Sequence, residues 1–309
     1  MELPSESALK YVVSRYARLL ADHGEAFEGV ELVTPDGEHF PDAFERDADS
    51  VLVLLHRMAS YAPLDEEMEL EIGFFEPEDV GGGGKSCSSG ACGTGGSARV
   101  RIDGVEPTKR GYRVPLAVPD TGHATTLTTA LARAVGAIVL AEAEQEVPKD
   151  ELGAMSEIAA AACGLGPLLC AGAHLYRKGC SGVNVQVGTE LSVAEQCVLL
   201  ALTCAVNGWK PRKARAHLEP TQAELLDEAV AWVESNDHLV DALKTHPESL
   251  ADGFFEIKPV RGFLGRLFKK KSSEADLAPA PAAKKTRSAE EERRLAEAKR
   301  LVEEALSEE

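Results

Sequence analysis

Two cysteines in a glycine-rich loop, together with one histidine, are the residues of this chain whose types best suit a metal ion. Cys87 and Cys92 lie in the loop GGGGKSCSSGACGTGG, and His123 follows further along the chain. Zinc prefers thiolate sulfur and imidazole nitrogen, and a structural zinc site takes four ligands. The sequence offers no evident fourth ligand. The loop therefore predicts a partial zinc site, a labile disulfide pair or two ordinary thiols, and these alternatives stay open.

The same loop contains the end of a phosphate-binding motif but not its beginning. A P-loop needs a glycine, four further residues, Gly-Lys-Ser/Thr and then a helix. Gly84, Lys85 and Ser86 match the end, but Asp79 stands where the first glycine should be, and the residues that follow are too rich in glycine to start a helix. A carboxylate and a missing helix N-terminus both disfavour a bound phosphate. The loop does not predict nucleotide binding.

Two charged residues stand alone in apolar stretches of the chain. Arg133 is the one charged residue between positions 130 and 141, and Glu157 precedes a long uncharged run. A carboxylate that is removed from water needs a compensating partner. If the two stretches pack against each other as helices, Arg133 is the candidate partner. We expect a buried structural ion pair between Arg133 and Glu157.

Two long apolar segments must position this pair. Residues 121–146 carry apolar side chains at helical spacing, and residues 151–180 have no charged side chain between positions 158 and 176. Helices that are apolar on nearly every face lie inside a protein or a membrane. The second segment is just long enough to cross a bilayer, but it is rich in Ala, Gly and Cys, which contribute little transfer energy. We expect both helices in the core of a soluble protein.

The flanking sequence predicts more helices and a few strands. Helices are expected where apolar residues recur at helical spacing or follow a capping box, at 5–22, 47–61, 192–208 and 221–236. Strands are expected where apolar residues alternate, at 68–76, 98–104 and 112–118, with a strand-turn-strand over 29–40 and a loop over 180–190. The expected fold is α+β and predominantly helical, with a central apolar helix pair and a small strand-containing section near the N-terminus.

The order of the core helices resembles that of zincin-type metallopeptidases of bacteria. The features that carry the resemblance are helix 121–146, the Gly-Leu-Gly sequence that follows Glu157 on the second helix, and the sequence Leu-Ser-Val-Ala-Glu-Gln at the start of the third. The match covers about residues 122–208. In such enzymes an HExxH motif on the first helix supplies two zinc-binding histidines and a glutamate that activates water, and the second helix supplies an acidic third ligand.

The resemblance places the motif on residues that have lost its chemistry. Ala132 stands where the first histidine would be, Arg133 where the glutamate would be and Gly136 where the second histidine would be. Only Glu157 matches, in the position of the acidic ligand. Alanine and glycine offer no ligand atoms, and a guanidinium repels a dication. The resemblance therefore implies a degenerate site without a cofactor, in which Arg133 neutralises Glu157.

The composition changes near residue 255. Residues 256–288 are expected to form a basic-apolar segment and a disordered Pro/Ala-rich linker, and residues 289–309 a charged helix. In the segment, apolar and basic side chains lie close together, at Phe263, Leu264, Leu267, Phe268, Lys269, Lys270 and Lys271. Such a segment can bind an anionic membrane weakly, with its apolar side inserted. Docking on the acidic surface of the chain's own domain is the alternative.

Charge and cysteine content limit the classes of function. The net charge of −18 argues against general nucleic-acid binding, because a phosphate backbone needs a basic surface. The N-terminus lacks the basic-then-apolar order of a secretory signal. Seven cysteines, an odd number, indicate the reduced thiols of a cytosolic protein.

These observations predict a cytoplasmic, non-catalytic binding or scaffold protein, a pseudoenzyme whose protein partner the sequence does not name. Residues 1–255 are expected to form one domain, with the zincin-like core at about 121–208. One alternative is an enzyme, either a metal-dependent hydrolase with zinc as cofactor or a thiol protein, that uses Cys87, Cys92 and His123. The other is a peripheral adaptor on the inner membrane face that acts through residues 259–271.

Overall fold

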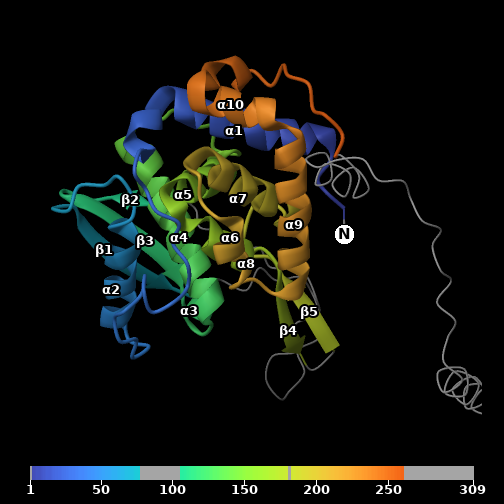
Figure 1. The fold of residues 1–309 in the computed structure, drawn as a ribbon. Coiled ribbons are helices and arrows are strands. Elements are labelled where there is room, and N and C mark those ends of the chain that lie inside the picture. The colour runs from blue at the N-terminus through green and yellow to red at the C-terminus, as the bar shows by residue number, and fades with distance from the viewer. Residues whose placement is uncertain (1, 77–104, 180–181, 261–309) are drawn as a thin grey trace, which may run out of the picture. The chain divides into compact units, whose positions relative to one another are not determined.

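The computed structural model describes residues 2–76, 105–179 and 182–260. By its internal contacts the chain divides into residues 1–261 and 262–309, and the fold described here is that of the first unit. Helices predominate, and a small three-stranded sheet lies in the N-terminal half (Figure 1). The fold is therefore α+β and mostly helical, as the sequence predicts. The expected strand at 98–104, the linker and the C-terminal helix lie outside the described residues.

The helices and strands follow one another in a mixed order. The helices of the described residues are α1 Glu6–His23, α2 Ala48–Ala59, α3 Val118–Thr121, α4 Ala124–Glu142, α5 Leu152–Ala160, α6 Gly166–Gly172, α7 Val193–Asn207, α8 Pro211–Arg215, α9 Pro220–Ser235 and α10 Asp237–Thr245. The strands are β1 Glu69–Phe75, β2 Glu106–Pro107, β3 Gly111–Ala117, β4 Leu175–Gly179 and β5 Gly182–Gln186. Strand β3 lies between β1, which runs parallel to it, and the antiparallel β2.

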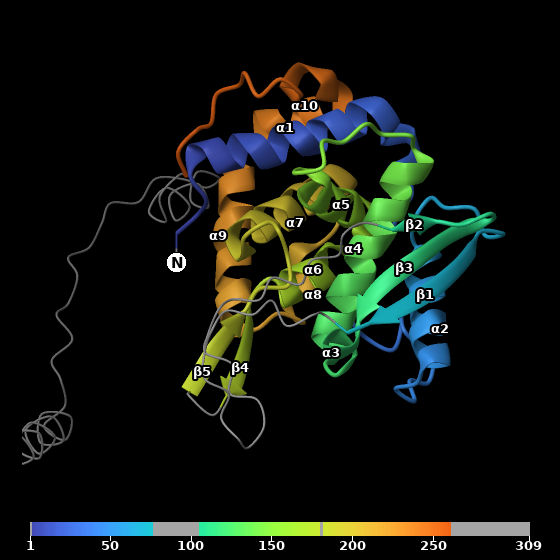
Figure 2. The same ribbon diagram turned by 180° about the vertical axis from the view of Figure 1, so that it is seen from behind.

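The core forms around α4 and α5, which pack closely against each other. Figures 1 and 2 show α4 between the three-stranded sheet and the helices α5, α6 and α7. A Cβ at Gly136 of α4 would overlap the carbonyl oxygen of Ser156 on α5, so glycine sets how near the two helices come. Both α4 and residues 152–172 are long and apolar enough to cross a membrane, but 78% and 89% of their apolar windows are buried inside the fold. That burial fits the core role that the sequence predicts.

The second core helix is interrupted by a π-helical turn, Ala161–Leu165. Within this turn Gly164 has φ 85°, a left-handed conformation that glycine adopts without a steric penalty. The Gly164 carbonyl in this turn accepts a hydrogen bond from Val33 N–H at 3.1 Å. The two strands expected within residues 29–40 are therefore wrong, whereas the expected turn forms at residues 37–39. Leu32 and Val33 are buried against the core, where they contact a helix instead of pairing with another strand.

The boundaries of the two core helices also differ from the expectation. The first helix is preceded by the separate turn of α3 and runs only from Ala124 to Glu142. The second ends at Gly172, and the residues after it form the antiparallel hairpin of β4 and β5 in place of the expected helix end and loop. The sequence Gly-Val-Asn-Val-Gln of β5 alternates as a strand does, and the apolar run before it obscures that pattern.

Several local expectations are confirmed. Helices α1 and α2 and strands β1 and β3 form where the sequence predicts them. Ser192 and Glu195 form the expected capping box of α7, and Gly208 ends that helix with φ 70°. The capping box predicted at 221–224 is wrong. It is formed two residues earlier by Glu219 and Gln222, because Pro220 takes the first helical position.

Replacing Gly164 by alanine tests the contact between the π-helical turn and the segment at Val33. A Cβ at position 164 meets the carbonyl oxygen of Glu31, whereas a Cβ at Gly29, which has a similar φ of 78°, meets nothing within 4 Å. Gly29→Ala should lower the unfolding free energy by about 1–2 kcal/mol, the cost of a left-handed alanine. Gly164→Ala should cost about 1–3 kcal/mol more, because the segment must move. Urea denaturation measures both, and equal costs would contradict the contact.

Candidate functional site

Arg133 and Glu157 meet in the centre of the fold, between α4 and α5. Arg133 Nε lies 2.9 Å from Glu157 Oε1, and the two side chains are 3% and 0% exposed. The buried ion pair that the sequence predicts is therefore confirmed. Both charges are removed from water, so each depends on the other and on the polar groups around them.

Three N–H donors also reach the Glu157 carboxylate. The backbone N–H of Glu190 donates to Oε1 at 2.6 Å, the backbone N–H of Leu191 donates to Oε2 at 3.0 Å, and Gln196 Nε2 donates to Oε2 at 2.7 Å. These donors come from the segment before α7 and from α7 itself. The Glu157 carboxylate of α5 therefore fixes the position of the segment before α7 as well as that of α4.

Arg133 contacts the same segment from the other side. Its Nη1 donates to the carbonyl oxygen of Gly188 at 3.3 Å, and its Nη2 lies 3.7 Å from Glu190 Oε1. The guanidinium thus bridges α5 and residues 188–190. Charge-assisted hydrogen bonds of this kind are stronger than neutral ones, and more so where water is excluded.

The other two positions of the expected degenerate site lie in the same place but offer no ligand atom. Ala132 is fully buried on α4, and Gly136 lies one turn further on, against the Ser156 carbonyl. Any side chain at position 136 would clash with that carbonyl, beginning with its Cβ. The four residues are thus brought together, and the space between their helices holds a guanidinium and close backbone contacts.

The surroundings of Glu157 both raise and lower the pKa of its carboxyl group. Burial is the largest influence and raises the pKa of its carboxyl group, because water no longer stabilises the anion; with all its neighbours included the pKa is raised to about 7. Arg133 and the backbone N–H groups of Glu190 and Leu191 lower the pKa and so oppose this rise. The ionised form thus depends on Arg133, on these two backbone N–H groups and on the side-chain N–H of Gln196, which also donates to the carboxylate.

The structure does not show the other predicted site residues, the metal ligands and the membrane-binding set, lying together. Cys87 and Cys92 lie outside them, as do all seven residues of the expected membrane-binding set. His123 is the residue before α4; it is exposed, and its side chain does not cap the helix. Across residues 2–76, 105–179 and 182–260, no group of three His, Cys, Asp or Glu side chains could hold a metal ion. The cysteines of this part are buried, at positions 163, 170, 197 and 204.

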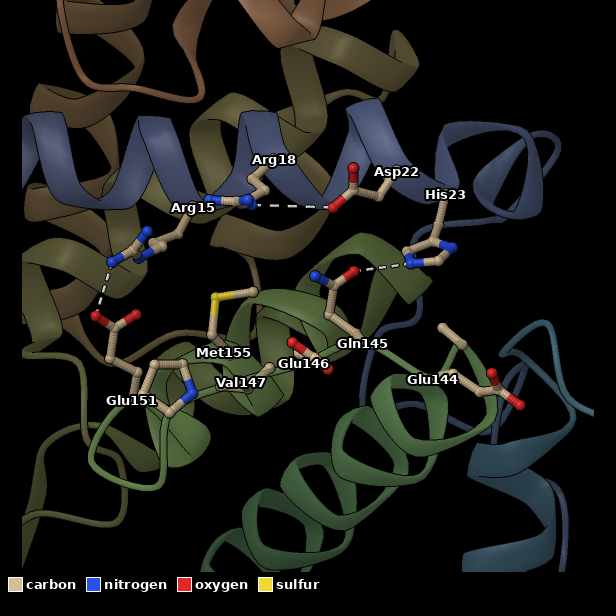
Figure 3. A pocket seen from close by; sticks show the side chains of 12 residues that line it. Arg15, Arg18, Asp22, His23, Glu144, Gln145, Glu146, Val147, Glu151 and Met155 are labelled. Carbon is tan, nitrogen blue, oxygen red and sulfur yellow. Dashed lines mark hydrogen bonds and ion pairs between the residues drawn. The ribbon is translucent and has the colours of Figure 1, made fainter.

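A polar pocket of about 610 Å³ lies between α1 and the chain that joins α4 to α5 (Figure 3). Arg15 pairs with Glu151 at 2.7 Å, His23 Nε2 lies 2.8 Å from Gln145 Oε1, and Arg18 lies 4.0 Å from Asp22. Arg15 and His23 of α1 thus pair with residues of the opposite wall, and Arg18 pairs with Asp22 on its own helix. Sequence reasoning missed the pocket because its two walls are far apart along the chain.

An apolar groove of about 380 Å³ lies between residues 35–44, α2 and the first turns of α4. Phe40, Phe44, Val53, Leu54 and Leu127 are among the side chains that line it. Phe44 is 42% exposed and Val53 is 46% exposed, which is unusual for large apolar side chains this close together. The apolar Val53 on the outer face of α2 is a signal in the sequence, but the groove itself depends on where residues 35–44 lie.

Comparison of the chain with protein-family models, with curated proteins and with solved structures finds no match. The resemblance to zincin-type metallopeptidases therefore stays a prediction that rests on the residues of the chain itself.

Breaking the ion pair from one side should be costly. Arg133→Met leaves the Glu157 carboxylate buried without its cation, and we expect a loss of about 3–5 kcal/mol in unfolding free energy at pH 8. The double variant Arg133→Met, Glu157→Gln removes both charges and keeps an acceptor for the donors of residues 190, 191 and 196. It should be more stable than Arg133→Met alone. Urea denaturation of the wild type, Arg133→Met, Glu157→Gln and the double variant gives the coupling energy, and additive effects would contradict the pair.

The raised pKa of Glu157 also predicts a pH dependence of stability. A carboxyl group whose pKa is higher in the folded state than in the unfolded one stabilises the fold at low pH, and this contribution is lost as the pH rises through the folded value. The unfolding free energy of the wild type relative to Glu157→Gln should therefore fall between about pH 4.5 and pH 7. In Arg133→Met the fall should be larger, because the lowering influence of the cation is gone. A difference that does not change with pH would contradict this environment.

Proposed function

We propose that this protein is a non-catalytic binding protein with a degenerate metallopeptidase-like core. The observation that carries the proposal is the Arg133 guanidinium, which lies 2.9 Å from Glu157 where the resemblance would place a metal ion. A guanidinium has no free electron pair for a metal, and its charge repels a dication. With alanine at position 132 and glycine at position 136, Glu157 is the only one of the four residues with ligand atoms.

The closeness of the helices supports the same proposal. Restoring a histidine at position 136 would drive its side chain into the Ser156 carbonyl, so α4 and α5 would have to separate. The ion pair of Arg133 with Glu157, which joins these two helices, would separate with them. The core is thus adapted to the ion pair, and a return to metal chemistry would require more than one substitution.

The surface supports a role in binding. A monomeric protein rarely leaves large apolar side chains together at its surface unless they contact a partner. Phe44 and Val53 flank a groove, and grooves lined by apolar side chains take peptide segments of partner proteins. We therefore assign the binding role to this groove and a purely structural role to the buried pair.

Elemental analysis of the purified protein tests the absence of metal chemistry. The wild type should contain far less than one zinc per chain, and dialysis against excess zinc followed by desalting should not change this. Glu157→Gln is the matched control for the core, and Cys87→Ser with Cys92→Ser is the control for the loop. One zinc per wild-type chain that Glu157→Gln loses would contradict the proposal. Zinc that only the cysteine variant loses would favour a metal site in the loop.

A further inference from the structure

The rim of the apolar groove is acidic. Residues 35–58 supply most of the residues that line the groove, and we call their charged side chains its rim. They contain six Asp and Glu side chains, of which Asp36 and Asp42 line the groove, and two arginines, a net charge of −4. An apolar floor with charges of one sign around it gives a partner both a source of affinity and an electrostatic preference. The local charge has the same sign as the whole chain, so a cationic partner is attracted at long range as well.

Some of these acids already have a structural task. Asp42 receives two hydrogen bonds from Arg57, at 2.9 and 3.2 Å, and Asp47 caps α2 through the N–H of Ser50. Asp36 accepts hydrogen bonds from Thr34 and His39, which hold the turn that forms one wall. These contacts fix the rim in place, and the exposed pair of Asp42 with Arg57 adds little stability that a partner would have to replace.

Other acids of the rim are available to a ligand. Glu45 and Asp49 are exposed, and within the described part of the chain neither forms an ion pair. They lie just before and in the first turn of α2, beside Phe44, Ser50 and Val53 of the groove.

The walls indicate the shape of the ligand. Two helices, α2 and the start of α4, line the groove together with residues 35–44, and the two helices contact each other. A third helix packs well into the space between two neighbouring helices, with its apolar face inward and its polar face in water. Phe44 and Val53, 42% and 46% exposed, are placed to contact that apolar face.

We infer that the groove binds a basic amphipathic helix of a partner protein, with leucine-like side chains between Phe44 and Val53 and lysine or arginine side chains on the acidic rim. The inference rests on the proposed binding function and adds the chemistry of the partner. Apolar burial supplies the affinity, and the rim selects for cationic partners and against anionic ones. Binding therefore weakens as salt screens the rim but does not vanish.

A fluorescent helical peptide of leucine and lysine, with leucine at helical spacing, is the probe for the full-length chain. Fluorescence anisotropy should detect binding of this peptide and little or none of the peptide in which glutamate replaces lysine. A scrambled peptide of the same composition, which has no apolar face, should bind more weakly by about tenfold or more. Equal binding of the three peptides would overturn the inference.

Variants of the groove locate the site. Phe44→Ser with Val53→Gln should weaken binding of the lysine peptide by about tenfold or more, whereas Phe254→Ser, which removes a phenylalanine that is 91% exposed outside the groove, should leave it unchanged. Glu45→Gln with Asp49→Asn should weaken binding at low salt and have less effect at high salt. Glu224→Gln with Glu228→Gln, two exposed acids of α9, is the matched charge control.

The outcomes separate this inference from the proposed function. Binding that survives Phe44→Ser with Val53→Gln, while circular dichroism shows the variant folded, would overturn the groove as the site. A chain that binds none of the peptides would overturn the inference as well, and the zinc content would still decide whether the core is non-catalytic. Light scattering adds one further outcome. If the wild type is a dimer and Phe44→Ser with Val53→Gln is a monomer, a second copy of the chain occupies the groove, and the inference of a different partner protein is overturned.

Discussion

The fold depends on the burial of two opposite charges at the crossing of two apolar helices. Removing a carboxylate or a guanidinium from water costs several kcal/mol for each ion, and only close contacts recover it. Here the recovery comes from Arg133, from two backbone N–H groups and from Gln196, all within 3.0 Å of the Glu157 carboxylate. The segment that carries those N–H groups must therefore lie against α5, and α7 begins where that segment ends.

The same crossing explains why small residues lie where the core helices meet. Gly136 lets α4 approach α5 until the backbones touch, and the approach brings the guanidinium within reach of the carboxylate. The π-helical turn after α5 serves a similar purpose further along, because Gly164 offers its carbonyl to Val33. Since these interactions are internal, we place the proposed partner binding at the surface, where α4 begins and α2 packs against it.

The sequence predicts the parts of this fold that depend on local pattern. Apolar residues at helical spacing mark α1, α2, α4 and α7, and two isolated charges in apolar helices suffice to predict the ion pair. What it does not predict depends on tertiary contacts. The sequence around Leu32 and Val33 resembles that of a strand, but the backbone of Val33 bonds to the π-helical turn. The β4–β5 hairpin follows an apolar run that hides where the helix ends. The groove and the polar pocket each join segments that only the fold brings together.

Hydrogen exchange of the backbone N–H groups of Glu190 and Leu191 tests the central role of Glu157 most directly. Both groups lie in an irregular segment, where exchange is ordinarily fast, yet both donate to a fully buried carboxylate. If the ion pair fixes this segment, nuclear magnetic resonance should show them exchanging as slowly as the amides in the middle of α4. Exchange as fast as that of the exposed residues between α2 and β1 would contradict the account.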